Sequence, residues 1–206
     1  MNTNRKTQST IINYYERINE ELKHEIETQK SNRVAFQDLA NKSIRTLNIL
    51  NTNNKDSIFT LKELLGATAT GWELNITLPV SDEFISSNYL TEVENDSLKL
   101  EFNFISKMKE YLPIHNDIKK LQYVNTIEPF FNKHINYSHV AHELYKDNLV
   151  IGGPPTNYEI LFDNMEFWNI VTFRLENITS DLRLIDRIIR SFEFMNREIE
   201  KELKNN

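Results

Sequence analysis

The chain of 206 residues has no cysteine, four glycines and five prolines. Without cysteine it forms no disulfide, no thiolate metal site and no cysteine nucleophile. So few glycines and prolines argue against a β-sandwich or barrel, which needs frequent turn residues. No uninterrupted apolar stretch reaches the ~18 residues expected of a membrane-spanning helix, and the polar start lacks the apolar core of a secretory signal. Long uninterrupted helices remain compatible with this composition.

The charge of the chain is moderately negative, with a formal net value of −6. Its short basic clusters, Arg5-Lys6 and Lys119-Lys120, cannot follow a phosphate backbone, so no nucleic-acid partner is predicted. Apolar residues make up 39 % and charged residues 26 % of the chain. An apolar fraction below the globular norm favours an elongated molecule, in which more of the chain stays in contact with water.

Two long stretches carry apolar residues at steps of three and four, the spacing of one helix face. Residues 5–50 are predicted to form one helix or two in line. Residues 163–204 are predicted to form the last helix, beginning near Asp163, which has capping-box spacing with Glu166. The stripe of the first stretch is Ile11, Tyr15, Ile18, Leu22, Ile26, Phe36, Leu39, Ser43, Leu47 and Leu50. The stripe of the second is Trp168, Val171, Leu175, Ile178, Leu182, Ile185, Ile189, Phe192, Ile199 and Leu203.

Residues 57–95 are predicted to hold short helices and an irregular loop. The first helix, Ser57–Leu65, ends at Gly66 in this interpretation, because glycine readily adopts the left-handed cap conformation. A second helix begins with Ser81 or Asp82 as its N-cap.

Residues 96–125 are predicted to form a further helix, with an apolar stripe from Leu98 to Leu112. Pro113 is expected to end or kink this helix, because proline lacks the backbone donor. Beyond the proline, a helical pattern continues through Ile114, Ile118, Leu121 and Val124.

The width of the last apolar stripe indicates what it packs against. Additional apolar residues flank it: Ile170, Phe173, Leu184, Ile188, Phe194 and Met195. A two-stranded coiled coil needs only a narrow seam, whereas a wide stripe indicates burial against several helices. We therefore predict an all-α fold: an elongated helical bundle and single domain over residues 1–206, with its long N- and C-terminal helices packed antiparallel. A homodimer through the last helix is the alternative.

Candidate site residues are few, and no catalytic residue or cofactor is predicted. The segment HINYSHVAHE contains His134, His139, His142 and Glu143. If it is helical, His139 and His142 share a face at a spacing that can hold a metal, but a HExxH arrangement is missing and a structural role is the alternative. Trp72 lies in the loop GATATGWELN, where an aromatic side chain lines a binding site or plugs the end of a bundle. On the last helix, the spacing predicts an Asp186–Arg190 pair.

The segments EFISSNYLTEVENDSLKLEFNFISKMKEY (Glu83–Tyr111) and FDNMEFWNIVTFRL (Phe162–Leu175) resemble uncharacterised single-pass membrane proteins of Bacteroidota. The opening NTNRKTQST and the ending IEKELK are similar to the same family, although Asn88 stands where the family pattern has glycine. The basic N-terminus and membrane helix of the family are missing here. The resemblance implies that the chain is the soluble part of such a protein, or a member without the anchor. In the family, the positive-inside rule places this part outside the cytoplasm.

These patterns lead to one functional hypothesis and two alternatives. The chain is predicted to be a non-enzymatic interaction or sensory domain, the extracytoplasmic part of a membrane-tethered protein, which binds an unidentified protein partner or small ligand. Without an anchor, the protein is expected in the cytoplasm. One alternative is a metal-binding or enzymatic helical bundle that uses the histidine cluster. The other is a cytoplasmic coiled-coil assembly protein that associates through its last helix.

Overall fold

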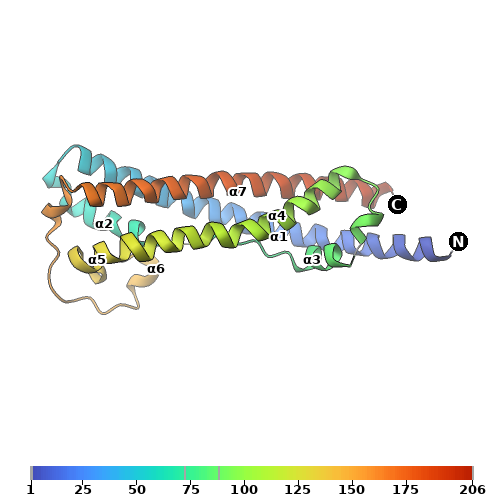
Figure 1. Ribbon diagram of the computed structural model, residues 1–206, viewed down its shortest axis with the longest axis horizontal. Helices are drawn as coiled ribbons and strands as arrows, with labels where there is room; N and C mark the ends of the chain where they lie inside the picture. Colours follow the sequence, from blue (N-terminus) through green and yellow to red (C-terminus); the bar gives the residue numbers. More distant parts are fainter. Residues whose placement is uncertain (1, 72, 88, 206) are drawn as a thin grey trace. The chain divides into compact units, whose positions relative to one another are not determined.

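The computed structural model describes residues 2–71, 73–87 and 89–205, with side chains from Thr7 onward. The chain is 83 % helical, and the described residues contain no strand, which confirms the all-α prediction. The α-helices are α1 (Asn2–Asn51), α2 (Ile58–Ala69), α3 (Pro79–Ser86), α4 (Asp96–Gln122), α5 (Glu128–His134), α6 (Glu143–Lys146) and α7 (Met165–Asn205) (Figure 1). Short 3₁₀ segments are η1 (Lys55–Ser57), η2 (Tyr89–Glu92), η4 (Tyr137–His139) and η5 (Tyr158–Leu161), and η3 (Tyr123–Ile127) is a π-helical turn.

The chain divides into two compact units. Unit 1 comprises Met1–Arg33, Leu74–Ile114 and Arg183–Asn206, and unit 2 comprises Val34–Glu73 and His115–Leu182. Each of the long helices α1, α4 and α7 contributes a segment to both units. The single-domain organisation stays a prediction. None of the described helices combines the length and the apolar character needed to cross a membrane.

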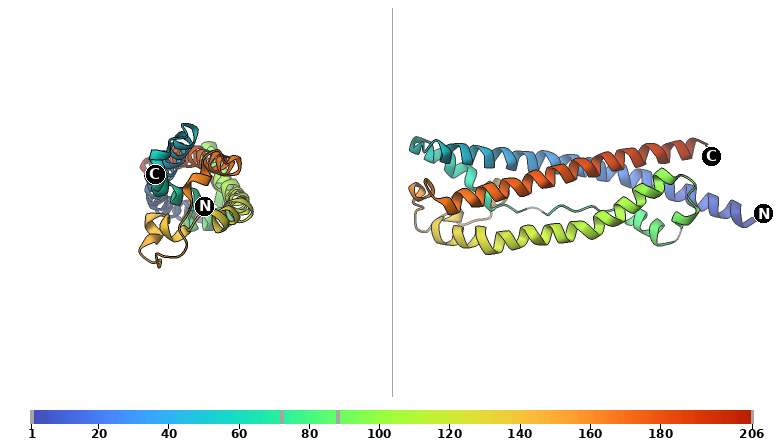
Figure 2. Two further views of the ribbon diagram at one scale, coloured as in Figure 1. Left: turned by 90° about the vertical axis from the view of Figure 1, so that its left-hand side faces the viewer. Right: turned by 45° about the horizontal axis from the view of Figure 1, so that its top comes forward.

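In unit 1, α1 and α7 lie side by side and run in opposite directions (Figures 1 and 2). Among the described side chains, three ion pairs join the two helices: Lys23–Glu200 (3.8 Å), Lys30–Glu193 (3.5 Å) and Arg33–Asp186 (2.6 Å). Residue numbers rise along α1 as they fall along α7, so the predicted antiparallel packing is confirmed. Asp186 pairs with Arg33 of α1, and the prediction of a pair with Arg190 on its own helix is therefore wrong.

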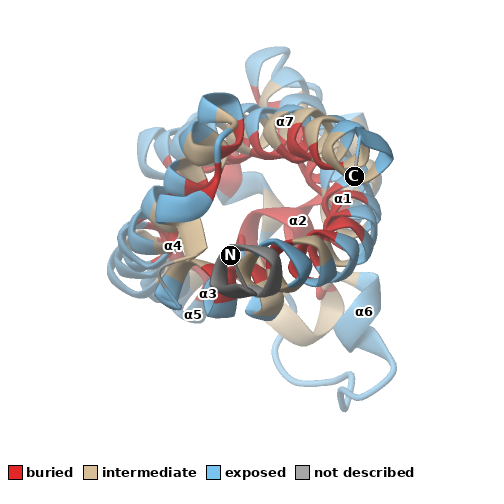
Figure 3. Cartoon of the chain, turned by 90° about the vertical axis from the view of Figure 1, so that its right-hand side faces the viewer, coloured by how far each residue is buried: buried red, intermediate tan, exposed pale blue. Residues whose placement is uncertain are grey.

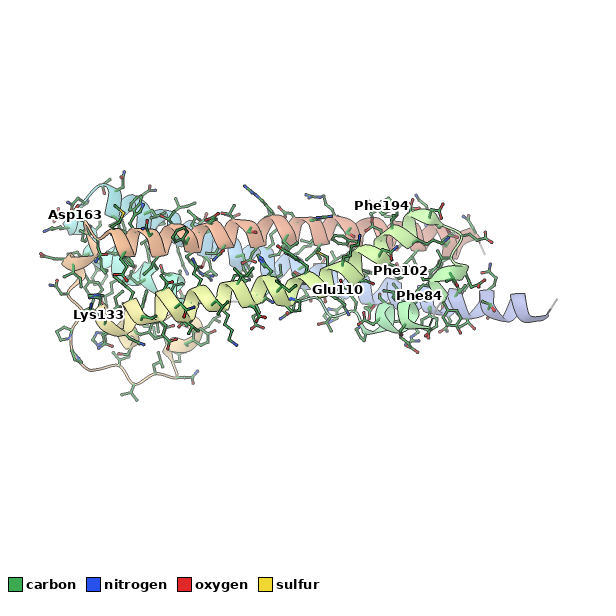
Figure 4. The ribbon with its side chains drawn as sticks, in the orientation of Figure 1. Phe84, Phe102, Glu110, Lys133, Asp163 and Phe194 are labelled. Carbon is green, nitrogen blue, oxygen red and sulfur yellow. The ribbon has the colours of Figure 1, made fainter. Side chains whose placement is uncertain are left out.

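The core of unit 1 is built from the predicted stripes. Buried members include Ile18, Leu22, Leu98, Phe102, Ile105, Ile185, Phe192 and Ile199. Phe84 of α3 and Phe102 of α4 point toward each other, with ring centroids 4.9 Å apart (Figure 4). Aromatic contacts of this kind contribute beyond the area they bury.

The N-terminus of α3 is capped by another helix. Glu21 of α1 accepts hydrogen bonds from the backbone N–H groups of Val80 (2.6 Å) and Ser81 (3.0 Å), and from the Ser81 hydroxyl (2.7 Å). The helix begins at Pro79, which lacks the N–H that a first-turn residue would leave unpaired. The prediction that Ser81 or Asp82 is the N-cap is therefore wrong, because the acceptor comes from α1.

The core of unit 2 is a cluster of buried apolar side chains. Its members are Leu50, Leu61, Leu65, Ala69, Ile127, Phe130, Phe131, Ile135, Val140, Leu161, Phe162, Phe167, Ile170 and Val171. The helix α2 continues through Gly66 to Ala69, so the prediction that Gly66 ends it is wrong. A Cβ atom at Gly66 would lie 2.4 Å from the backbone oxygen of Val140 and 2.7 Å from the nitrogen of His142. Glycine is needed here for close backbone approach rather than for a turn.

The helix α4 does not end at Pro113 but continues to Gln122. Before the proline, the predicted stripe from Leu98 to Leu112 is buried. After it, Ile118 and Leu121 are each 60 % exposed, whereas polar residues turn inward. The buried polar residues of this part of α4 are His115, Asn116 and Lys119.

The helix α7 begins at Met165, and Asn164 caps it by accepting the backbone N–H of Phe167 at 2.9 Å. Asp163 instead has a positive φ of 57°, so the prediction that it is the cap is wrong by one residue. Buried positions lie on the inward side of the helices and exposed positions on the outer side (Figure 3). On α7 the buried positions include the flanking residues Ile170, Ile188 and Met195. The other predicted flanking residues are not buried: Phe173 is 50 % exposed, and Leu184 and Phe194 are partly exposed. The buried stripe is therefore wider than a narrow seam, but less wide than predicted.

Candidate functional site

The four predicted metal candidates do not form one site. His139 ends η4 and Glu143 begins α6, so the segment is not one helix and the shared face of His139 and His142 does not form. His139, His142 and Glu143 line a cavity of about 480 Å³ in unit 2. His134 does not line it, and its ring centroid lies 4.8 Å from that of Phe130. Within the described part of the chain, no three His, Cys, Asp or Glu residues are grouped to hold a metal ion.

His142 has an identifiable structural role. Its Nδ1 accepts the backbone N–H of Leu144 at 3.3 Å, which makes it the N-cap of α6. Burial lowers the pKa of His142, and the nearby Lys42 lowers it further. A neutral ring suits the cap, because a protonated Nδ1 cannot accept a hydrogen bond.

A second cavity of unit 2, which we call the Arg174 cavity, has a volume of about 380 Å³. Such a volume is in the range of small-molecule sites, roughly 300–1,000 Å³. Its lining comes from α2 and the segment after it, and from α4, η3, η4, α6 and α7. The lining includes three cationic residues and three tyrosines: Lys119, Lys120, Arg174, Tyr123, Tyr137 and Tyr145. Polar side chains from separate elements therefore converge on one cavity.

Two of the cationic residues belong to a buried charged cluster. Asp181 of α7 has no exposed surface and accepts hydrogen bonds from Lys119 Nζ at 3.0 and 3.2 Å. The Nε2 atom of His115 lies 2.7 Å from Asp181 Oδ1. Burial lowers the pKa of Lys119, and the adjacent Asp181 acts in the opposite direction. A buried charge is tolerated when it is paired in this way.

Arg174 is the other buried cation, with 4 % of its surface exposed. Its guanidinium donates to the backbone oxygen of Thr70, directly after α2. Across the described residues, its Nε atom has no hydrogen-bond partner and no carboxylate lies within ion-pair distance of it. Burial lowers the pKa of Arg174 and the charge of Asp181 opposes this effect. An arginine side chain nevertheless stays protonated, so the cavity is lined by a buried positive charge.

Three tyrosines line the same cavity. Burial raises the pKa of Tyr123 and of Tyr137, so both hydroxyls keep their protons at neutral pH. A protonated hydroxyl donates and accepts hydrogen bonds. The cavity can thus bind an anionic or hydrogen-bonding molecule, and the available groups are mostly donors.

Sequence reasoning did not identify this cavity. The prediction for Trp72 lies outside the described residues, but its neighbours Gly71 and Glu73 line the Arg174 cavity. Arg174 and Asp181 lie beside Leu175 and Leu182, which the apolar pattern places on the inner face. The structure buries the charged residues and leaves the two leucines partly exposed. The sequence of α4 could have pointed to this cavity. Steps of three and four from the buried Leu112 lead to His115, Asn116 and Lys119, so the inward face of the helix becomes polar there.

Comparison with models of known protein families, with curated proteins and with solved structures finds no match for this chain.

Proposed function

We propose that this chain is a non-enzymatic sensory or interaction domain that binds a small ligand in the Arg174 cavity. The observation that carries the proposal is the convergence of polar side chains from separate helices on one cavity of unit 2. Polar groups that converge in a cavity of this size typically orient a bound molecule.

The hydrogen bonding of the cluster favours binding over catalysis. A general base must reach the proton it removes. Asp181 is fully buried and is not among the residues that line the cavity. Its carboxylate accepts hydrogen bonds from Lys119 and lies beside His115 Nε2, so Asp181 is engaged within the cluster and not with the cavity.

We also propose that the protein acts at the extracytoplasmic face of a bacterial membrane. The support is the resemblance of Glu83–Tyr111 and Phe162–Leu175 to membrane-tethered proteins of Bacteroidota, which stays a prediction. Membrane fractionation of cells that produce the natural protein, with protease protection, tests this part. A protein that is released by carbonate and shielded from external protease would contradict it.

Ligand binding is tested by thermal unfolding in the presence of separate organic acids, amino acids, nucleotides and sugars. The test variant is Gly71→Trp, which places a large side chain at the cavity lining. Gly71 is exposed, and a Cβ atom there meets nothing within 4 Å, so we expect the variant to fold. A compound that raises the melting temperature of the wild type should lose its effect in this variant.

The matched control is Gly152→Trp. Gly152 is also exposed with nothing within 4 Å of its Cβ position, but it does not line the Arg174 cavity. We expect this control to respond to ligand as the wild type does. If every compound acts equally on the wild type and on Gly71→Trp, the proposal is wrong.

Self-association is a second candidate function, favoured by the outer face of α4. Ile118 and Leu121 are each 60 % exposed at a three-residue step, the spacing of a coiled-coil seam. Most of the α7 stripe is buried within the chain and its remaining members are only partly exposed, so α4 rather than α7 offers a surface to a second copy. Light scattering at ~100 µM should show a dimer that Ile118→Asn disrupts, whereas a wild-type monomer would exclude an interface of standard size.

A further inference from the structure

The charges around the Arg174 cavity do not balance. Among the described buried residues of this cluster, Lys119 and Arg174 are cationic and Asp181 is the one carboxylate. Asp181 is already engaged by Lys119 and His115. Glu73 also lines the cavity, but it is exposed and water screens its charge. One buried positive charge, that of Arg174, is therefore left without a directly bonded counter-charge.

The hydrogen bonding of Arg174 is incomplete in the same way. A guanidinium has five N–H donors in a planar fork, which matches the two oxygens of a carboxylate or phosphate. Here one donor reaches the backbone oxygen of Thr70, and the buried Nε–H has no partner in the described part of the chain. A buried charged donor without a partner is costly, and proteins retain one chiefly where something else completes it.

We propose that the Arg174 cavity binds a small organic acid, with the carboxylate or phosphate of the ligand paired to the Arg174 guanidinium. This inference rests on the proposed function that the cavity binds a ligand. The oxyanion supplies the missing counter-charge and accepts the unpaired N–H. Lys119 and Lys120 add positive potential from α4.

The remaining lining indicates the body of the ligand. Tyr123, Tyr137 and Tyr145 line the cavity, and each carries an aromatic ring and a hydroxyl group. Aromatic faces pack against a planar ring, and the hydroxyls bond polar substituents on it. An aromatic acid therefore matches this lining better than an aliphatic one of equal charge.

The test measures thermal unfolding and calorimetric binding with four probes at one fixed ionic strength. The probes are benzoate, its neutral isostere benzamide, phenyl phosphate and inorganic phosphate, with sodium chloride as the ionic-strength reference. We expect benzoate or phenyl phosphate to raise the melting temperature, and benzamide to bind at least roughly tenfold more weakly, because a charge-assisted pair is lost. The response to benzoate against phenyl phosphate identifies the head group.

The test variant is Arg174→Met, which removes the charge and keeps an unbranched apolar stem. Since the charge is uncompensated without ligand, we expect this variant to melt no lower than the wild type, while losing the response to the acids. The control Arg190→Met changes an exposed arginine on the same helix and should leave the response intact.

The remaining outcomes contradict either the anion inference alone or the proposed function as well. Binding of benzamide as tightly as benzoate overturns the anion inference but leaves the proposed function standing. A response that chloride reproduces at equal concentration is ionic screening and also overturns the inference. If Arg174→Met melts lower and still responds to the acids, Arg174 is structural and the inference fails. If none of the four probes binds and the wider panel is silent too, both proposals fail.

Discussion

Gly66 shows that the local preference of a helix and the packing around it can act in opposite directions. In a helix interior, alanine is ordinarily favoured over glycine by about 1 kcal/mol. At Gly66, however, a Cβ atom would overlap the backbone of residues 140–142, which cannot rotate away as a side chain would. Overpacking of this kind costs about 1–3 kcal/mol.

We therefore expect Gly66→Ala to lower the free energy of unfolding by about 1–3 kcal/mol. Urea denaturation followed by circular dichroism measures the change. Gly152→Ala serves as the control, because nothing lies within 4 Å of its Cβ position, and its effect should stay within about 0.5 kcal/mol. A Gly66→Ala protein as stable as the wild type would show that the two backbones do not meet this closely.

His142 provides a residue-scale prediction on pH. Burial and Lys42 lower its pKa in the folded state, whereas Glu143 and Asp38 act in the opposite direction. Between the lowered folded pKa and about 6.5, the unfolded chain binds more protons at this site, so its contribution to stability falls as the pH falls. The variant His142→Asn still offers an N-cap acceptor but does not titrate.

The measurement compares the free energy of unfolding of both proteins at pH 7.5 and at pH 5.5. We expect the wild type to lose more stability on acidification than His142→Asn does. Because both proteins share all other titrating groups, the difference between them isolates His142. Equal losses would mean that His142 titrates alike in the folded and unfolded chain.

At the scale of elements, α3 depends on a neighbour for its N-terminus. The first N–H groups of a helix have no partner within it, and Leu78 at the cap position supplies no side-chain acceptor. Glu21 of α1 supplies the acceptor instead, and its negative charge also suits the positive end of the helix dipole. The short α3 is thus positioned by α1 as well as by its own sequence.

Glu21→Ala should lower the free energy of unfolding by about 1–3 kcal/mol, because several charge-assisted hydrogen bonds are lost together. Hydrogen exchange should also show faster exchange at the amides of Val80 and Ser81. The adjacent Glu20 pairs with Lys23 on the surface, at 3.0 Å, and Glu20→Ala should change stability by less than about 1 kcal/mol. If the two variants behave alike, the cap contributes nothing beyond an ordinary surface charge.

The long helices α1 and α7 pack against each other and run in opposite directions. The ion pairs between them in unit 1 are partly exposed, and pairs of this kind contribute only about 0.2–1 kcal/mol each. These ion pairs contribute little to stability, but they show which residues of α1 and α7 lie opposite each other.

The register is testable because the chain has no cysteine of its own. Lys30→Cys with Glu193→Cys should be joined within the monomer by a short bismaleimide cross-linker, detected by mass spectrometry, because the two native side chains meet at 3.5 Å. In the control pair, Lys30→Cys with Lys204→Cys, the α7 site lies three helical turns further along, roughly 16 Å, and this pair should stay unlinked. Efficient cross-linking of the control pair would place α7 in a different register.

Apolar steps along the sequence were enough to predict the long helices α1, α4 and α7, and the width of the last stripe led to the antiparallel pairing of the first and last helix, but the limits of the short helices were not predicted. Such steps show which face of a helix is apolar, and this face can be identified from the sequence whatever element packs against it. The packing of the helices, by contrast, brings His115 and Lys119 to Asp181 and Arg174 to Thr70. A charged side chain is buried only where another helix brings a partner to it, and these partners lie far apart in the chain. The cavity and its excess positive charge follow from that convergence, which no local pattern of residues contains.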